Sequence, residues 1–192
     1  DLFAAVAASL PILVTGGIHM DGYLDTVDAL ASHQTREKKL EIMKDPSCGA
    51  FAVIYSGVYL LAYAGFACEV YLAGKILLLC PLFVLSRALS GLCAVNLPNA
   101  RKAGMLCAFT SLVRRRTATA ALALTGFAAV AGMICLSPAA GGTAAVFAVL
   151  SALVYRRFAM AQFGGVTGDT SGFFLQLCEL CGLVGAWVGG LL

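Results

Sequence analysis

The stretch AFAVIYSGVYLLAYAGFACEVYLA, residues 50–73, decides the fold class because Glu69 is its only charged residue. A helix that crosses the hydrocarbon core of a bilayer needs roughly 20 consecutive apolar residues. Further apolar segments of similar length lie on both sides of it, at residues 1–18, 75–96, 117–137, 139–160 and 172–192. We therefore predict an all-α fold, a polytopic integral membrane bundle of about six transmembrane helices.

The composition of the whole chain also indicates a membrane protein. Of its 192 residues, 60% are hydrophobic and 12% are charged, whereas soluble domains are about one-quarter charged. We find no internal repeat and no low-complexity linker, so we expect a single transmembrane catalytic domain over residues 1–192. The chain begins at Asp1, already inside an apolar segment, and we therefore expect that it is truncated at its N-terminus.

Neither the cysteines nor the net charge indicates another class of protein. The eight cysteines lie mostly in the apolar segments and form a single CxxC motif, Cys178 and Cys181. We expect them to pack as small apolar residues. The net charge is only +3, and nucleic-acid binding needs a basic face with aromatic side chains for stacking. We therefore expect no nucleic-acid partner.

The basic residues mark one side of the membrane. Three long polar connections, 19–49, 97–116 and 161–171, alternate with two short ones, so the long ones share one side if successive helices alternate in direction. Most of the 13 Lys and Arg residues lie in or next to them: Arg36, Lys38, Lys39, Lys44, Arg101, Lys102, Arg114, Arg115, Arg116, Arg156 and Arg157. The positive-inside rule makes this side cytoplasmic. We expect the functional site there, at the inner membrane of a bacterial or archaeal cell.

The segment TGGIHMDGYLDTVDAL, residues 15–30, carries three aspartates, Asp21, Asp25 and Asp28. Their i, i+4, i+7 spacing places them within roughly a 60° arc of one helix face. Like charges at this spacing repel each other, and no Lys or Arg lies among them. Proteins commonly hold Mg²⁺ with Asp carboxylates and the phosphate oxygens of a substrate. This stripe of aspartates therefore predicts a Mg²⁺ site, and Gly22 leaves room for a ligand near the helix backbone.

A second acidic segment follows, TREKKLEIMKDPSCGAF, residues 35–51. Glu41 and Asp45 are four residues apart in it, but Lys and Arg residues are interleaved with them. This pattern favours an amphipathic interfacial helix that ends at Pro46.

A third segment, FGGVTGDTSGFF, residues 163–174, places Gly168 and Asp169 just before the last apolar segment. The N–H groups at a helix N-terminus bind anionic groups, so Asp169 is either a site residue or the N-cap of the helix. The spacing leaves both alternatives open. Glu179 lies about 15 Å further along the same helix, inside the membrane, where a carboxylate is a functional candidate.

Three basic residues are candidates for binding phosphate. Arg87 lies within an apolar segment, whereas Arg101 and Lys102 follow that segment. The forked guanidinium of arginine matches phosphate oxygens in a bidentate manner. An arginine inside the membrane is energetically costly unless it has a role, so Arg87 is a stronger functional candidate than Arg101.

Taken together, these motifs resemble the cobalamin synthase family, adenosylcobinamide-GDP ribazoletransferase. The family's pattern reads TGG-h-H-h-DG-h-h-D-t-x-D, then LEIM-[KR]-D-x-x-x-G, then GG-x-TGD-x-x-G with a downstream Glu. The chain has every fixed position of this pattern from Thr15 onward, and Glu179 fills the last one. Members carry a further N-terminal segment, which agrees with a truncated chain and leaves open whether this chain is active.

The resemblance implies a Mg²⁺-dependent membrane enzyme that joins α-ribazole 5′-phosphate (or α-ribazole) to adenosylcobinamide-GDP and releases GMP, late in cobalamin assembly. It implies metal binding by Asp21, Asp25, Asp28 and Asp169, which are also catalytic candidates. Asp28 or Asp45 is expected to take the proton from the attacking ribose hydroxyl. The expected substrate-binding residues are Gly22, Glu41, Arg87, Arg101, Lys102, Gly168 and Glu179. The sequence leaves open whether the chains form a homo-oligomer in the lipid membrane.

Other functions remain as alternatives. A CDP-alcohol phosphotransferase also has a DG…D…D cluster at the end of a membrane helix, but its Ala-Arg pair is missing here, where Tyr23 and Leu24 precede Asp25. A cation- or proton-coupled transporter would place its carboxylates near the bilayer midplane, where we expect only Glu179. A catalytically silent assembly scaffold would not depend on the acidic residues.

Overall fold

The computed structural model describes residues 2–101 and 104–192. These residues form nine α-helices and one short 3₁₀ helix, η1, and they include no β-strand. In chain order the elements are α1 (Leu2–Val14), α2 (Ile18–Ala31), α3 (Arg36–Ile42), α4 (Ala50–Leu72), η1 (Ile76–Leu78), α5 (Leu79–Asn96), α6 (Met105–Leu112), α7 (Arg115–Leu136), α8 (Pro138–Phe163) and α9 (Gly168–Gly190). The predicted all-α fold is confirmed.

Five helical elements are long and apolar enough to cross a membrane: α4, η1 together with α5, α7, α8 and α9. α1 and α2 meet the same criterion only as a pair, and they are bent by 93° at the break between them. The described residues therefore hold five or six elements of membrane-spanning length, in agreement with the predicted polytopic bundle.

The bend between α1 and α2 is a feature that the apolar pattern did not predict. Gly16 and Gly17 lie in it with φ angles of 62° and 79°, a left-handed conformation that glycine adopts most readily. α2 is 14 residues long and carries three aspartates, and such charge is expensive in hydrocarbon. We therefore treat α2 as lying outside the membrane-spanning segments.

α9 packs against α2, α4, α5 and α8, and most of its residues are buried. Small residues allow it to approach α8 closely. A Cβ atom on Gly185 would lie 2.7 Å from the carbonyl oxygen of Thr143, and one on Gly189 would lie 2.6 Å from that of Ala139. Because α9 is held along its length, the position of its first turn is fixed.

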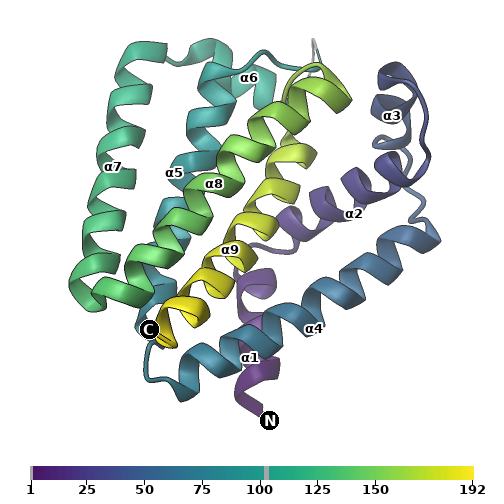
Figure 1. Cartoon of the computed structure of the whole chain (residues 1–192). Coiled ribbons are helices and arrows are strands. Elements are labelled where there is room, and N and C mark those ends of the chain that lie inside the picture. The colour runs from purple at the N-terminus through teal and green to yellow at the C-terminus, as the bar shows by residue number, and fades with distance from the viewer. Residues whose placement is uncertain (1, 102–103) are drawn as a thin grey trace.

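The long connections lie at one end of the bundle. Figure 1 shows α3, α6 and the turn between α8 and α9 at the upper end, whereas both chain termini lie in the lower half. α2 runs from the middle of the molecule toward this upper end, beside α9. The arrangement brings the acidic helix α2 to the start of α9.

Candidate active site

α2 packs against α9 where its residue Gly22, next to Asp21, meets the first turn of that helix, whereas Asp28 contacts the start of α4. Asp21 is exposed, whereas Asp25 and Asp28 are partly buried. A Cβ atom on Gly22 would lie 2.7 Å from the carbonyl oxygen of Asp169, so the two helix backbones touch at this point. A larger residue would push α2 away from α9. The fold therefore adds Asp169 to the predicted stripe of aspartates.

Asp25 is electrostatically coupled to the other three carboxylates. Its burial, followed by the charges of Asp21 and Asp169, raises the pKa of Asp25 to about 6, although Arg101 opposes this shift. Asp28 adds a smaller repulsion. Ionising several carboxylates so close together is unfavourable, and a bound cation would remove the penalty.

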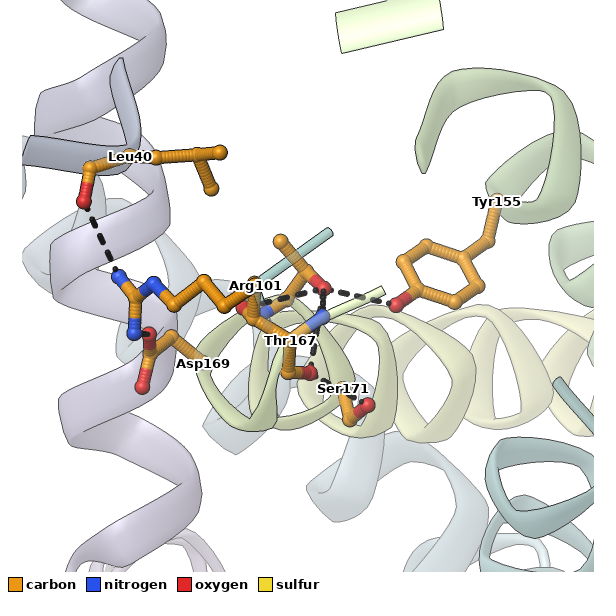
Figure 2. Close-up of polar contacts among 7 residues, drawn as sticks. Leu40, Arg101, Tyr155, Thr167, Asp169 and Ser171 are labelled. Atoms are coloured by element: carbon orange, nitrogen blue, oxygen red, sulfur yellow. Dashed lines mark hydrogen bonds and ion pairs between the residues drawn. The ribbon is translucent and has the colours of Figure 1, made fainter. Parts of the chain in front are cut away.

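The first turn of α9 is held by a capping network from which Asp169 is absent (Figure 2). The Thr167 hydroxyl accepts a hydrogen bond from the Thr170 N–H at 3.1 Å, and the Thr170 hydroxyl accepts one from the Thr167 N–H at 2.9 Å. Tyr155 of α8 donates to the Thr170 hydroxyl at 3.1 Å. Thr167 is therefore the N-cap, and the alternative in which Asp169 caps the helix is wrong.

Asp169 instead forms an ion pair with Arg101 (Figure 2). Nη1 of Arg101 donates to Oδ2 of Asp169 at 2.9 Å, and Nη2 donates to the carbonyl oxygen of Leu40 in α3 at 3.3 Å. The side chains of Arg101 and Asp169 remain 23% and 26% exposed. Arg101 therefore links α3 to α9 while staying accessible to a ligand.

The segment that carries Arg101 is docked on the turn between α8 and α9. The Val166 N–H donates to the Pro98 carbonyl oxygen, and the Ala100 N–H donates to the Val166 carbonyl oxygen, each at 2.9 Å. Gly165 is required beside these two hydrogen bonds, because a Cβ atom there would collide with the Pro98 carbonyl oxygen. These contacts place Arg101 next to a residue that is 68 positions away in the sequence.

A small cavity of about 100 Å³ adjoins the ion pair, and Asn99, Arg101, Gly168 and Asp169 contribute to its wall. The Oδ1 atom of Asn99 and the Nε atom of Arg101 are buried without a hydrogen-bond partner among the described residues. Asn99 was not predicted from the sequence. Its only signal in the sequence was its place in the polar connection, two residues before Arg101. Lys102, predicted to bind substrate, lies outside the described residues.

The two carboxylates expected as candidate bases have different environments. Both oxygens of Asp28 accept hydrogen bonds from the start of α4, from the N–H groups of Gly49 and Ala52. Asp45 is exposed, and its hydrogen bonds with Ser47 lower the pKa of the Asp45 carboxyl. Asp28 is therefore positioned by the fold, whereas Asp45 is held only by its own turn.

The predicted amphipathic helix is present as α3, which ends at Ile42 rather than at Pro46, and it is docked on the end of α8. The Arg36 guanidinium donates to the Ala161 carbonyl oxygen at 3.1 Å, and the Lys39 ammonium donates to the Gln162 side chain. Glu41 points away from this contact, is 66% exposed and pairs with Lys38 at 2.7 Å. Substrate binding by Glu41 stays a prediction.

Arg87 and Glu179 lie together in the bundle rather than at the acidic end. The Arg87 guanidinium donates to Glu179 and to the Ser86 hydroxyl. Glu179 is only 3% exposed, on a membrane-spanning helix and about 15 Å along it from Asp169. The structure therefore pairs these two predicted substrate-binding residues with each other.

The carboxylates suit a hard divalent cation in charge and chemistry. Among the described residues, however, no group of three or more His, Cys, Asp or Glu side chains is arranged to hold a metal ion by itself. Mg²⁺ is usually bound by one or two carboxylates together with substrate phosphates. The donor set fits Mg²⁺ in that incomplete form, with Asp21 and Asp25 as the available ligands. Asp169 is paired with Arg101 and Asp28 with N–H groups of Gly49 and Ala52, so metal binding by these two residues stays a prediction.

Comparison with known proteins agrees with the sequence motifs. A family model described as cobalamin-5-phosphate synthase matches residues 1–187. The chain belongs to this family. The resemblance found in the sequence motifs is thereby confirmed.

Members of the cobalamin-5-phosphate synthase family share substantial identity with the chain. A protein of Lachnoclostridium phytofermentans, named adenosylcobinamide-GDP ribazoletransferase, is 44% identical over 179 residues, which cover 93% of this chain and 68% of the relative. A protein of the same name from Pseudomonas fluorescens is 34% identical over 189 residues, or 96% of this chain and 75% of the relative. No solved structure matches the chain.

Proposed function

We propose that this chain is an adenosylcobinamide-GDP ribazoletransferase, acting in the nucleotide-loop assembly step of cobalamin biosynthesis. The donor would be adenosylcobinamide-GDP, the acceptor α-ribazole 5′-phosphate, and the leaving group GMP. The activity is the one named for relatives of which the chain covers more than two-thirds. The observation that carries the proposal is the convergence of four carboxylates with Arg101 at one end of a membrane bundle.

The acidic residues suit the diphosphate end of the donor. Asp21, Asp25 and Asp169 would hold Mg²⁺ together with phosphate oxygens of the substrate. The bound ion would neutralise charge on the diphosphate and on the departing GMP. Burial and then the repulsion from Asp21 and Asp169 raise the pKa of Asp25, and a cation would offset the repulsion.

Arg101 would bind phosphate by exchanging partners. Its guanidinium now contacts Asp169 and Leu40, and its side chain is partly exposed. A diphosphate offers Arg101 a bidentate partner of higher charge than one carboxylate. When Arg101 turns to the phosphate, Asp169 loses its counter-ion and becomes available to the metal. Nucleotide and metal would therefore bind cooperatively.

Asp28 is the better placed of the two expected general bases. It lies on the same helix face as Asp25, and two N–H groups of α4 fix the orientation of its carboxylate. Asp45 is exposed, and its lowered pKa makes it a weaker base. We assign to Asp28 the removal of the proton from the attacking ribose hydroxyl.

The side of the membrane follows from the charge distribution. The end of the bundle that carries the acidic site also carries the Lys- and Arg-rich connections, which favours the cytoplasmic side of the inner membrane. The substrates would then meet the site from the cytoplasm.

One assay tests the proposed function. The full chain in lipid nanodiscs is incubated with adenosylcobinamide-GDP and α-ribazole 5′-phosphate, and released nucleotide is measured with and without EDTA. We expect GMP release that stops on chelation and resumes with excess Mg²⁺. GMP release that is insensitive to EDTA would reject the metal assignment. No conversion of these substrates, with CMP released from a CDP-alcohol instead, would reject the proposed reaction.

A further inference from the structure

In the half of the chain between Glu69 and Asp169, all charged residues are basic. It contains no acidic residue, yet it carries nine of the chain's 13 Lys and Arg residues: Lys75, Arg87, Arg101, Lys102, Arg114, Arg115, Arg116, Arg156 and Arg157. Five of these nine lie at the start of α7 or late in α8. Most of these basic residues therefore have no nearby carboxylate in sequence to neutralise them.

A cavity of about 470 Å³ lies between α5, α7 and α8 beside these arginines. Its apolar wall includes Leu89, Leu92 and Leu153, and the Leu153 side chain is 55% exposed on the outer surface of the bundle. Asn96, Arg115 and Arg156 supply the polar part of the wall. One wall of the cavity is therefore suited to a hydrocarbon chain and the other to an anion.

The two arginines of this cavity are positioned differently. Arg115 is held at the end of α5, because its Nε and Nη2 atoms donate to the side chain and the carbonyl oxygen of Asn96 at 3.1 and 3.2 Å. Arg156 is exposed and has no ion pair among the described residues. One guanidinium is therefore pre-positioned, and the other is available to an anionic ligand.

We propose that this cavity binds an anionic phospholipid. The headgroup phosphate would lie between Arg115 and Arg156, and an acyl chain would follow Leu89, Leu92 and Leu153 into the membrane. Basic pockets between membrane helices commonly hold acidic lipid headgroups. A soluble phosphate compound would use the arginines but leave the apolar wall unpaired, and a zwitterionic lipid would use the apolar wall but gain little from two cations. The site is separate from the acidic site and does not depend on the proposed reaction.

Native mass spectrometry of the full chain tests this site. The protein in detergent is offered an equimolar mixture of phosphatidylglycerol and phosphatidylcholine, and the retained lipids are counted. We expect the wild type to retain phosphatidylglycerol selectively. Each arginine near a membrane surface contributes about fivefold to the binding of acidic lipid, so the double variant Arg115→Gln/Arg156→Gln should lose roughly 25-fold in this preference.

A matched control separates the cavity from general surface charge. The double variant Arg114→Gln/Arg157→Gln removes the same charge from neighbouring residues outside the cavity wall, and it should keep the preference. An equal loss in both double variants would overturn the proposal, as would equal retention of the two lipids by the wild type. Displacement of phosphatidylglycerol by millimolar inorganic phosphate would also overturn it, because the apolar wall would then contribute nothing.

The single variant Arg156→Gln guards against a folding defect. Arg115 supports the end of α5, whereas Arg156 has no ion pair or side-chain hydrogen bond with any residue that the structure describes, so this variant should fold normally. We expect it to lose about fivefold in lipid preference. An unchanged preference in folded Arg156→Gln would contradict the proposed headgroup position.

Discussion

Arg101–Asp169 and Arg87–Glu179 are two arginine–carboxylate pairs joined to the same helix, α9, in different surroundings. In the first pair both side chains are about a quarter exposed, at the end of the bundle and next to three further aspartates. In the second pair the Glu179 carboxylate is 3% exposed and lies on a membrane-spanning helix, whereas the Arg87 side chain is 37% exposed. A pair in which both side chains are accessible exchanges partners at little cost, whereas breaking a pair with a buried carboxylate leaves that carboxylate unpaired. We infer that the first pair serves ligand binding and the second holds α5 against α9.

The largest effect is expected at the acidic end. Asp25→Asn removes the carboxylate most strongly coupled to the others, and we expect kcat to fall by about 10²–10³-fold, the loss typical of a charge-stabilising group. The thermal unfolding temperature should change little, because the side chain is only partly buried. GMP release and a melting curve measure the two quantities. Near-normal kcat at saturating Mg²⁺ would rule out Asp25 as a metal ligand.

Loss of the Arg87–Glu179 pair should affect stability rather than turnover. Glu179→Gln leaves Arg87 without its counter-ion, but the Arg87 side chain is 37% exposed, so we expect the free energy of unfolding to fall by only about 1 kcal/mol. Replacing both residues, in Arg87→Met/Glu179→Met, should cost less than the single change. Denaturant unfolding in detergent measures both. If Glu179→Gln is stable but raises the KM for either substrate, Glu179 contacts substrate as the sequence predicted.

Arg101→Gln tests the exchange of partners at the accessible pair. Without the guanidinium, Asp169 is free before nucleotide arrives, so Mn²⁺ measured by paramagnetic resonance in place of Mg²⁺ should bind roughly tenfold more tightly in the absence of substrate. GDP should tighten Mn²⁺ binding to the wild type but not to this variant. Unchanged or weaker Mn²⁺ binding by Arg101→Gln would show that Arg101 does not compete with the metal.

The smallest effect is expected at Asp45, which serves as the matched control for the aspartates of α2. Asp45 is exposed, and its hydrogen bonds are local to its own turn. Asp45→Asn should keep kcat within about twofold of the wild type, as surface substitutions usually do. Asp28→Asn should reduce kcat far more, because Asp28 is the proposed base. A severe loss in Asp45→Asn with normal turnover in Asp28→Asn would reverse our assignment of the base.

The sequence by itself determined the features that depend on local pattern. Apolar segments of membrane-spanning length predicted the helical bundle, because burying a helix in lipid depends chiefly on the hydrophobicity of its own residues. The spacing of Asp21, Asp25 and Asp28 predicted that they share a helix face, because helical periodicity is also local. The motifs around these aspartates and around Asp169 were enough to identify the family.

Only the tertiary structure decided which of these residues meet. The 93° bend before α2, the contact of Gly22 with Asp169 and the docking of the Arg101 segment depend on how separate helices cross. The same packing paired Arg87 with Glu179 and turned Asp28 toward the start of α4. Such contacts join residues far apart in the chain, and they are set by the close approach of small residues rather than by the spacing of charges.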